Sequence, residues 1–468
     1  MTDTVATIIS PPTERNAVRE TNKLAPDDRA VHDWYRFVLS FPPHLVGDYL
    51  DRFGATADTR VHDPFCGTDT TVVECKKRGI PSIGIEINPV AQFAGTVKTD
   101  WTPDPDGLLA HADEIAGIAL DTFHAQGIED DPVRGAGDGP PTLPTRLRIL
   151  PPEQWALLLT DSISPLPLHK TLTLLDILKR NNDERYGRHE LLALANALPF
   201  TISNLRFGPE VGLGTIKKDV SVIGTWHAGV RAMAEDLRAL SSFAPVPSVV
   251  HHADARQMLD VLEPESIDMV ITSPPYPNEK DYTRTTRLES VLLGFIESKE
   301  ELRTLKRGLV RSNTRGVYKG DDDDQWVSHF PEIQRIADEI EARRIELGKT
   351  SGFERLYARV TKLYFGGMAR HLADLRTILR PGALLAYVVG DQASYLRVMI
   401  RTGQLLAEIG ESLGYEVVGI DLFRTRMATA TKAQLREEVV LLRWPGMPSS
   451  ISNLVKMVSP FLLSDSIA

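Results

Sequence analysis

The chain has 468 residues, of which 42% are hydrophobic and 25% are charged, and its formal net charge at neutral pH is −10. The length and the hydrophobic content are sufficient for a large buried core and for more than one domain. The acidic balance excludes a protein that binds nucleic acid through its overall charge, so any such contact must come from local basic patches.

Residue usage excludes two further classes. The two cysteines, Cys66 and Cys75, can form neither a disulfide framework nor, without other ligands, a zinc site, and we expect no metal. The N-terminus lacks the basic start and apolar core of a signal peptide, and no apolar run approaches the ~18 residues of a membrane span. We therefore expect a soluble, cytoplasmic protein without a membrane partner.

The first elements form a recognisable unit. Residues 1–28 are polar and rich in proline, which predicts a flexible tail. The stretch 44–53 has helical spacing. Residues 59–62 are expected to form a strand that runs into DPFCGTDTT, followed by a helix ending at Gly79 and a buried strand over 82–87. Strand, glycine-containing turn, helix and strand make a βαβ unit, which predicts a parallel sheet.

The alternation of strands and helices resumes only at residue 248. Further strands are expected at 248–254, 267–273, 383–391, 416–426 and 436–444, and helices at 256–262, 368–382 and 402–415. The α/β framework thus spans 29–100 and 246–445 as one split domain. The segment 101–245 interrupts it with helical patterns, among them residues 151–163 and 189–200, and 297–360 is a second insertion. No structure is assigned to the serine-rich tail 446–468.

Two features predict a ligand at the carboxyl end of the βαβ unit. Asp63 ends the first strand and Gly67 lies in the turn before the helix, where backbone N–H groups favour an anionic group. Glu86 ends the second strand, 23 residues after Asp63, where a carboxylate can accept hydrogen bonds from both hydroxyls of a ribose. The alternative is a structural turn in an unrelated α/β protein, and the GxGxxG pattern of dinucleotide-binding proteins is absent.

Four motifs, DPFCGTDTT, GIEINP, HADAR and TSPPY, resemble in this order those of amino-directed DNA methyltransferases that use S-adenosylmethionine. The resemblance covers the two framework segments. It implies a Rossmann-like class I methyltransferase fold: a mostly parallel seven-stranded sheet with an antiparallel final strand, plus a largely helical insertion. It also implies that the turn holds the methionine part of the cofactor, with Glu86 at the ribose and Asp254 near the adenine. The cofactor-binding residues it implies are Asp63, Pro64, Phe65, Cys66, Gly67, Asp69, Thr70, Glu86, Asn88, Asp254 and Ala255.

One residue departs from this family's pattern. The second glycine of the FxGxG turn is Asp69 in this chain. Aspartate tolerates an unusual φ better than most residues. Its carboxylate is expected either to pair with the α-ammonium of the cofactor or to repel the cofactor's carboxylate. The second case would leave a DNA-binding homologue that has lost activity.

The chemistry of this family explains the sequence Ser273-Pro274-Pro275-Tyr276. An exocyclic amine is a poor nucleophile because its lone pair is delocalised into the ring. The Ser273 hydroxyl and the Pro274 carbonyl can accept its two hydrogens and direct the lone pair at the methyl group, if the prolines hold the turn rigid. Tyr276 offers a stacking face for a base taken out of the double helix. Considered alone, the tetrapeptide is equally typical of a proline-stiffened turn after an edge strand.

The resemblance leaves several target bases open. We call Ser273–Tyr276 the clamp. Serine at its first position favours N4 of cytosine, while N6 of adenine and N2 of guanine in RNA are alternatives. C5-cytosine methylation is disfavoured because Cys66 and Cys75 are both placed as packing residues. The expected setting is restriction-modification or phage defence, with double-stranded DNA as the substrate and a cognate restriction endonuclease or other defence proteins as further partners.

Basic residues in three segments are candidates for DNA phosphate contacts. The stretch 303–319 carries only basic charges and is followed directly by the acidic run 321–324. The other candidates lie in the helix or loop after the clamp and in the loop SNLRFGPEVGLGTIKKD of the insertion 101–245. The insertion 101–245 is our candidate for target recognition. Structural ion pairs, a solvated loop or a dimerisation module are the alternatives. The candidates are Arg206, Lys217, Lys218, Arg284, Arg287, Arg307, Arg311 and Arg315.

Overall fold

The computed structural model describes residues 24–25, 28–36, 41–130, 147–208, 210–278, 280–427 and 434–447. Most of the two tails expected at 1–28 and 446–468 lies outside these ranges. In the described part of the chain, no helix is long and apolar enough to cross a membrane.

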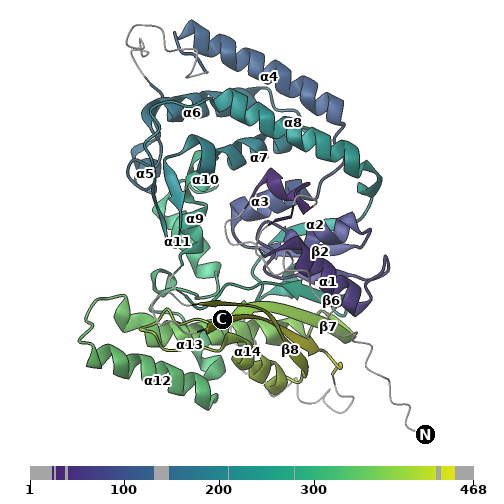
Figure 1. The fold of residues 1–468 in the computed structure, drawn as a ribbon, viewed down its shortest axis with the longest axis vertical. Coiled ribbons are helices and arrows are strands. Elements are labelled where there is room, and N and C mark those ends of the chain that lie inside the picture. The colour runs from purple at the N-terminus through teal and green to yellow at the C-terminus, as the bar shows by residue number, and fades with distance from the viewer. Residues whose placement is uncertain are drawn as a thin grey trace, which may run out of the picture.

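The centre of the molecule is a seven-stranded sheet with the order β5-β2-β1-β6-β7-β9-β8 (Figure 1). Its strands are β1 Val61–Asp63, β2 Ser82–Glu86, β5 Ser248–His252, β6 Ile267–Thr272, β7 Leu379–Gly390, β8 Glu416–Met427 and β9 Gln434–Arg443. The pairs from β5 to β7 are parallel, and only β9, the last strand in sequence, runs antiparallel to its neighbours. The Rossmann-like fold class expected from the sequence is confirmed.

Local sequence explains the first elements of the framework. Helix α1, Pro43–Phe53, starts with a proline and ends at Gly54, whose φ of 70° closes the helix. Helix α2, Thr70–Lys77, follows the turn after β1. Helix α3, Pro89–Lys98, begins at Asn88, whose side chain accepts a hydrogen bond from the Val90 amide. The βαβ unit thus forms where the sequence predicted it.

Both faces of the sheet are covered, as the alternation of side chains along β7 shows. Leu385 and Tyr387 pack with α13, Tyr357–Leu375, and α14, Thr402–Ser412. Ala386 and Val388 point the other way, into a cluster with Leu45 and Tyr49 of α1. A strand that is apolar on both faces is what a parallel sheet between two helical layers requires.

Within 101–245, the described residues form a helical body on one side of the sheet (Figure 1). Its elements are α4 Pro105–Ala125, α5 Pro152–Trp155, α6 Pro165–Arg180, α7 Gly187–Ala197, the π-helical turn η3 Leu198–Ile202, the hairpin β3 Leu205–Phe207 and β4 Val211–Leu213, α8 Val222–Leu240 and the 3-10 turn η4 Ser241–Phe243. A helix over 151–163 was expected, but α5 ends at Trp155 and the next helix, α6, begins at Pro165. The body packs against the N-terminal turn η2, His32–Trp34, where the Trp34 indole donates to Asp236 at 2.7 Å.

The segment that follows β6 connects this body to the sheet. Figure 1 shows α9, α10 and α11 between the helices of residues 101–245 and the large sheet. The elements of this segment are α9 Tyr282–Thr285, α10 Arg287–Leu292, α11 Lys299–Gly308, η6 Thr314–Gly316, η7 Asp323–Val327, α12 Pro331–Glu346 and η8 Glu354–Leu356. The short helix expected at 256–262 is reduced to the turn η5, Met258–Asp260.

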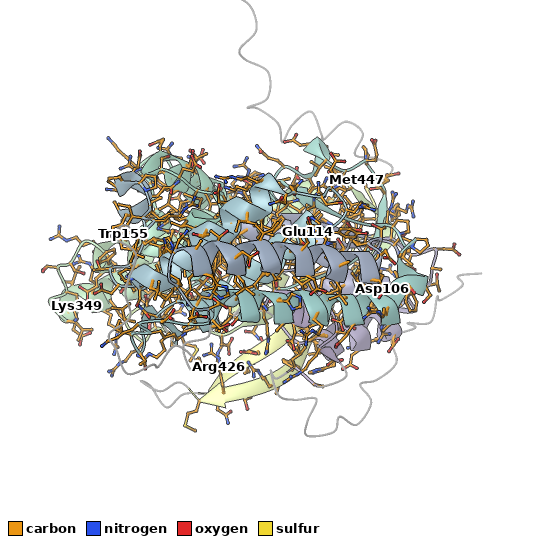
Figure 2. The ribbon with its side chains drawn as sticks, turned by 90° about the horizontal axis from the view of Figure 1, so that it is seen from above. Asp106, Glu114, Trp155, Lys349, Arg426 and Met447 are labelled. Atoms are coloured by element: carbon orange, nitrogen blue, oxygen red, sulfur yellow. The ribbon has the colours of Figure 1, made fainter. Side chains whose placement is uncertain are left out.

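Strands β8 and β9 extend beyond the end of β7. β7 ends at Gly390, opposite Glu437, whereas β8 and β9 continue pairing as far as Met427 and Gln434. Figure 2 shows this two-stranded end, marked by Arg426, projecting from the body of the molecule. The projection lies at the carboxyl end of β7, the same end of the sheet to which the site residues belong.

Candidate active site

A pocket of about 710 Å³ lies beyond the carboxyl ends of the parallel strands. In doubly wound sheets this is where ligands bind, at the point where the strand order reverses. Here the reversal falls between β1 and β6. The pocket wall is formed by the turn after β1, the ends of β2 and β5, the clamp after β6, residues 308–313 and the end of the β8–β9 ribbon.

The turn after β1 forms part of the pocket wall. Pro64, Phe65, Cys66, Gly67, Thr68 and Thr70 line the wall. Gly67 has a φ of 54°, and its amide donates to Glu86 Oε2 at 3.0 Å. A positive φ and the absence of a Cβ allow the chain to turn tightly beside a ligand.

Glu86, at the end of β2, is one of the acidic residues that line the pocket. Besides Gly67, the Asn88 amide donates to its Oε1 at 2.7 Å. Burial raises the pKa of Glu86 to about 7, although these backbone hydrogen bonds act in the opposite direction. Asn88 also lines the pocket, and its side chain donates to Thr286 at 3.1 Å, which connects α3 to the segment after the clamp.

Asp63 lies behind the pocket wall instead of on it. It is fully buried, and its Oδ1 accepts from the Thr272 hydroxyl at 2.6 Å and from the Phe65 amide at 3.1 Å. Burial raises the pKa of Asp63 to about 6. Asp63 therefore ties the end of β1 to the end of β6, and it is not among the residues that line the pocket.

Asp69, the residue that departs from the expected pattern, also points away from the pocket. It has a φ of 65° and is fully buried. A Cβ on Gly95 would lie 1.6 Å from Asp69 Oδ2, and a Cβ on Gly84 would lie 2.8 Å from Oδ1. The carboxyl group thus occupies space between β2 and α3 that two glycines leave open. Neither of the two expected contacts with a cofactor is formed by a side chain in this position.

The charge that Asp69 faces in the interior is Lys98. Lys98 is 1% exposed, and its ammonium group donates to the carbonyl of Thr68, inside the turn. Burial raises the pKa of Asp69 and lowers the pKa of Lys98, and their mutual attraction opposes both shifts. No nitrogen or oxygen of the described residues donates a hydrogen bond to the Asp69 carboxyl group. The largest favourable influence on this buried carboxylate is the hydrogen bond from the Cys66 thiol, and the attraction to Lys98 is the next largest.

Asp254 and Ala255 line the pocket where β5 ends. Arg256 binds the Asp254 carboxylate with two nitrogens, Nε at 3.0 Å and NH2 at 2.7 Å. The remaining nitrogen of Arg256 donates to Asp323 at 2.7 Å. The HADAR motif thus joins the pocket wall to the acidic run 321–324 through buried charges.

The Ser273–Tyr276 clamp follows β6, the strand that pairs with β1. The Ser273 hydroxyl donates to the carbonyl of Val388 in β7 at 3.2 Å. The Tyr276 ring covers Gly390, where a Cβ would lie 3.0 Å from Cε2. The Tyr276 amide donates to the Tyr282 hydroxyl at 3.2 Å, and its carbonyl accepts from Asn278 at 2.8 Å. All four clamp residues line the pocket.

The candidate DNA-contacting residues differ in the contacts that they make. Arg311 is 6% exposed, binds Asp321 through Nε and NH2, both at 2.9 Å, and donates to backbone carbonyls of residues 306–309, so it is structural and not available to a phosphate. Lys217 donates to two carbonyls at the end of η3, and Arg287 donates to Thr283 one helical turn earlier. Arg206, Lys218 and Arg307 are exposed, whereas Arg284 and Arg315 converge on Glu210.

Several residues of the pocket were not expected from the sequence. The segment 308–313 passes over the pocket and is held by the Tyr395 hydroxyl, which donates to the Ser312 carbonyl at 2.8 Å. Gln392, after β7, is 4% exposed, and its Nε2 has no hydrogen-bond partner among the described residues. The ribbon end adds Arg424, Arg426 and Glu437.

A metal site is not formed by the described residues, which contain no group of three or more His, Cys, Asp or Glu able to hold an ion. Both cysteines are buried and unpaired. Burial raises the pKa of the Cys66 thiol well above its usual value, as it does that of Cys75. Neither thiol is therefore activated as a nucleophile.

Comparison with known proteins gives several relatives, although no family model matches the chain. The Type II methyltransferase M.BsoBI of Geobacillus stearothermophilus is 25% identical over 89% of this chain and 84% of its own length. The Type II methyltransferase M.AvaI of Nostoc sp. is 24% identical over 91% of this chain and 88% of its own length. The Type II methyltransferase M.MjaII of Methanocaldococcus jannaschii is 40% identical, but over only 14% of this chain and 13% of its own length. The chain is thus similar to Type II methyltransferases over most of its length.

Proposed function

We propose that this protein transfers a methyl group from S-adenosylmethionine to an exocyclic amine of a base in double-stranded DNA, namely N4 of cytosine. The observation that carries the proposal is that one pocket contains both the turn with Glu86 and the Ser273–Tyr276 clamp. The similarity to Type II methyltransferases supports a restriction-modification setting. A cognate restriction endonuclease or other defence proteins are then further partners.

The residues at the first side of the pocket fit the proposed cofactor. Glu86 offers a carboxylate to the two ribose hydroxyls, and the backbone around Gly67 can approach the methionine part closely. When bound, the cofactor supplies an electrophilic methyl group on a sulfonium. Because Asp69 points into the interior, it neither repels nor binds the amino-acid end of such a ligand. This placement removes the physical reason to expect an inactive homologue.

The residues at the second side fit a flipped base. Ser273 gives its own hydrogen to Val388, so its lone pairs are left to accept a hydrogen of the amine. The Pro274 carbonyl is the proposed acceptor for the second hydrogen, and Tyr276 supplies the stacking surface. Holding both hydrogens directs the amine lone pair away from the ring and toward the methyl donor. Flipping the base out of the duplex costs a few kcal/mol, which stacking and these hydrogen bonds must offset.

The experiment that tests the proposal compares two variants at one position. Tyr276→Ala removes the stacking ring and should abolish transfer of tritiated methyl groups to plasmid DNA, while calorimetry shows unchanged binding of S-adenosylmethionine. Tyr276→Phe keeps the ring and should retain most of the activity. If Tyr276→Ala methylates DNA like the wild type, or loses the cofactor, then the clamp does not hold the base.

A further inference from the structure

Two arginines from separate segments meet at one carboxylate beside the pocket. Arg284 belongs to α9, after the clamp, and Arg315 belongs to η6, in the second insertion. Their NH1 atoms lie 3.6 Å and 3.5 Å from the same oxygen, Oε2 of Glu210. Glu210 comes from the β3–β4 hairpin of the helical body and lines the pocket together with Lys280 and Gly316. The three segments therefore converge at the mouth of the pocket.

These contacts differ from the structural ion pairs of the same region. The side chains of Arg284 and Arg315 are each 34% exposed and that of Glu210 is 51% exposed. Arg311, in contrast, is buried and holds Asp321 through two short hydrogen bonds. Exposed pairs at such distances contribute little to stability, because water screens them and their side chains lose rotamer freedom. The Glu210 contacts can therefore be exchanged for contacts with another anion at little cost in stability.

The surroundings of the two arginines add positive charge to an otherwise acidic molecule. Lys280 lies close enough to Glu210 and Arg426 for both charges to affect its pKa, which burial lowers. The Arg315 guanidinium also lies 5.8 Å from the centre of the Phe353 ring, which limits its orientation. Converging guanidinium groups can also bind a phosphodiester, because its two non-bridging oxygens share one negative charge as the two oxygens of a carboxylate do.

We propose that Arg284 and Arg315 together form the binding site for one DNA phosphate at the target nucleotide, and that Glu210 occupies this site until DNA binds. The inference rests on the proposed function and deepens it. A nucleotide flipped into the pocket leaves its own phosphate at the mouth, where this site lies. When DNA binds, the phosphate replaces Glu210 as the partner of both arginines. The contacts among the β3–β4 hairpin, α9 and η6 therefore change together.

The test measures the affinity for DNA as a function of salt. The probe is a fluorescent duplex that carries the site found by sequencing plasmid DNA methylated by the protein. Arg284→Gln and Arg315→Gln should each weaken binding roughly ten-fold at low salt, because a charge-assisted hydrogen bond is lost. Each phosphate neutralised contributes a slope of about −0.9 to the plot of log affinity against log salt. Since the two residues share one phosphate, the double variant should lose about one unit of slope, not two.

Glu210 gives the sharper part of the test, because its replacement should improve binding. Glu210→Gln removes the competing anion and should tighten DNA binding up to about five-fold, as expected from the small energy of exposed pairs. The matched controls are Arg335→Gln and Glu339→Gln, which break an exposed pair of 2.9 Å on α12, away from the pocket, and should change nothing. Binding of S-adenosylmethionine should be unchanged in every variant.

The outcomes separate this inference from the proposed function. If the wild type methylates DNA but the double arginine variant keeps its salt slope, or if Glu210→Gln binds DNA no more tightly, the shared phosphate site is wrong and the methyltransferase proposal stands. A loss of two units of slope in the double variant would also overturn it, since the two arginines would then bind separate phosphates. If the wild type methylates no DNA, the proposed function itself fails.

Discussion

The raised pKa of Glu86 leads to a quantitative prediction for cofactor binding. Burial raises this pKa to about 7 in the protein without cofactor. Ribose hydroxyls donate hydrogen bonds, so they stabilise the carboxylate and lower the pKa when a nucleoside binds. A protonated Glu86 must therefore lose its proton before it can accept from both hydroxyls, and affinity for S-adenosylmethionine should fall as the pH falls through 7.

The size of the effect follows from the titration of one group. Between pH 8 and pH 6 the ionised fraction of Glu86 falls from about nine tenths to about one tenth, so the affinity should fall roughly ten-fold, or about 1.4 kcal/mol. The stability of the free protein should change in the opposite direction. A carboxyl group with a raised folded-state pKa binds its proton more tightly when folded, so its contribution to stability is lost as pH rises through 7. Because the cofactor binds more weakly at pH 6 than at pH 8, the rise in melting temperature that it causes should be smaller at pH 6.

Isothermal calorimetry from pH 5.5 to 8.5, in buffers of different ionisation enthalpy, measures both the affinity and the protons released. The Glu86→Gln variant should bind roughly 10- to 100-fold more weakly at pH 8, because a charged acceptor is lost, and its affinity should not depend on pH in this range. A wild-type affinity that stays constant from pH 6 to pH 8, or a variant that keeps the pH dependence, would refute the role assigned to Glu86.

Two further predictions concern buried charges. Lys98→Met leaves the buried Asp69 without its counter-charge and should lower the free energy of unfolding by about 3 kcal/mol in urea titrations; adding Asp69→Gly should restore most of this loss, and additive effects of the two changes would contradict the pairing. Arg311→Ala should lower the free energy of unfolding by about 3 kcal/mol through the loss of its contacts with Asp321, without changing the salt dependence of DNA binding. Arg307→Ala should change this salt dependence and leave the free energy of unfolding unchanged.

The framework of this fold is predictable from the sequence because it depends on local patterns. A buried strand, a glycine turn, a helix ending in glycine and a second buried strand leave few alternatives to a parallel sheet, and β1, α2 and β2 form there. Short elements are less certain. The pattern of 151–163 predicts a longer helix than α5, because periodicity does not show where the chain turns to start the next element.

The sequence did not predict where the side chains of Asp69 and Arg311 point. Asp69 follows Gly67 by two residues, yet it points behind the turn because Gly84 and Gly95, which lie elsewhere in the sequence, leave space for it. Arg311 lies in a stretch without acidic residues, but the fold brings Asp321 to it from the next turn of the chain. Asp69 is placed by glycines that lie elsewhere in the sequence, whereas the counter-charge of Arg311 comes from the acidic run that directly follows the basic stretch.

The chemistry of the product tests the central claim most directly. Plasmid DNA from a strain without methyltransferases is incubated with the purified protein and S-adenosylmethionine, digested to nucleosides and analysed by mass spectrometry. The proposed function predicts N4-methylcytosine, and none of it after incubation with Tyr276→Ala. N6-methyladenine would keep the clamp but correct the target base, whereas 5-methylcytosine, or no methylated nucleoside from a protein that binds S-adenosylmethionine, would contradict the proposal.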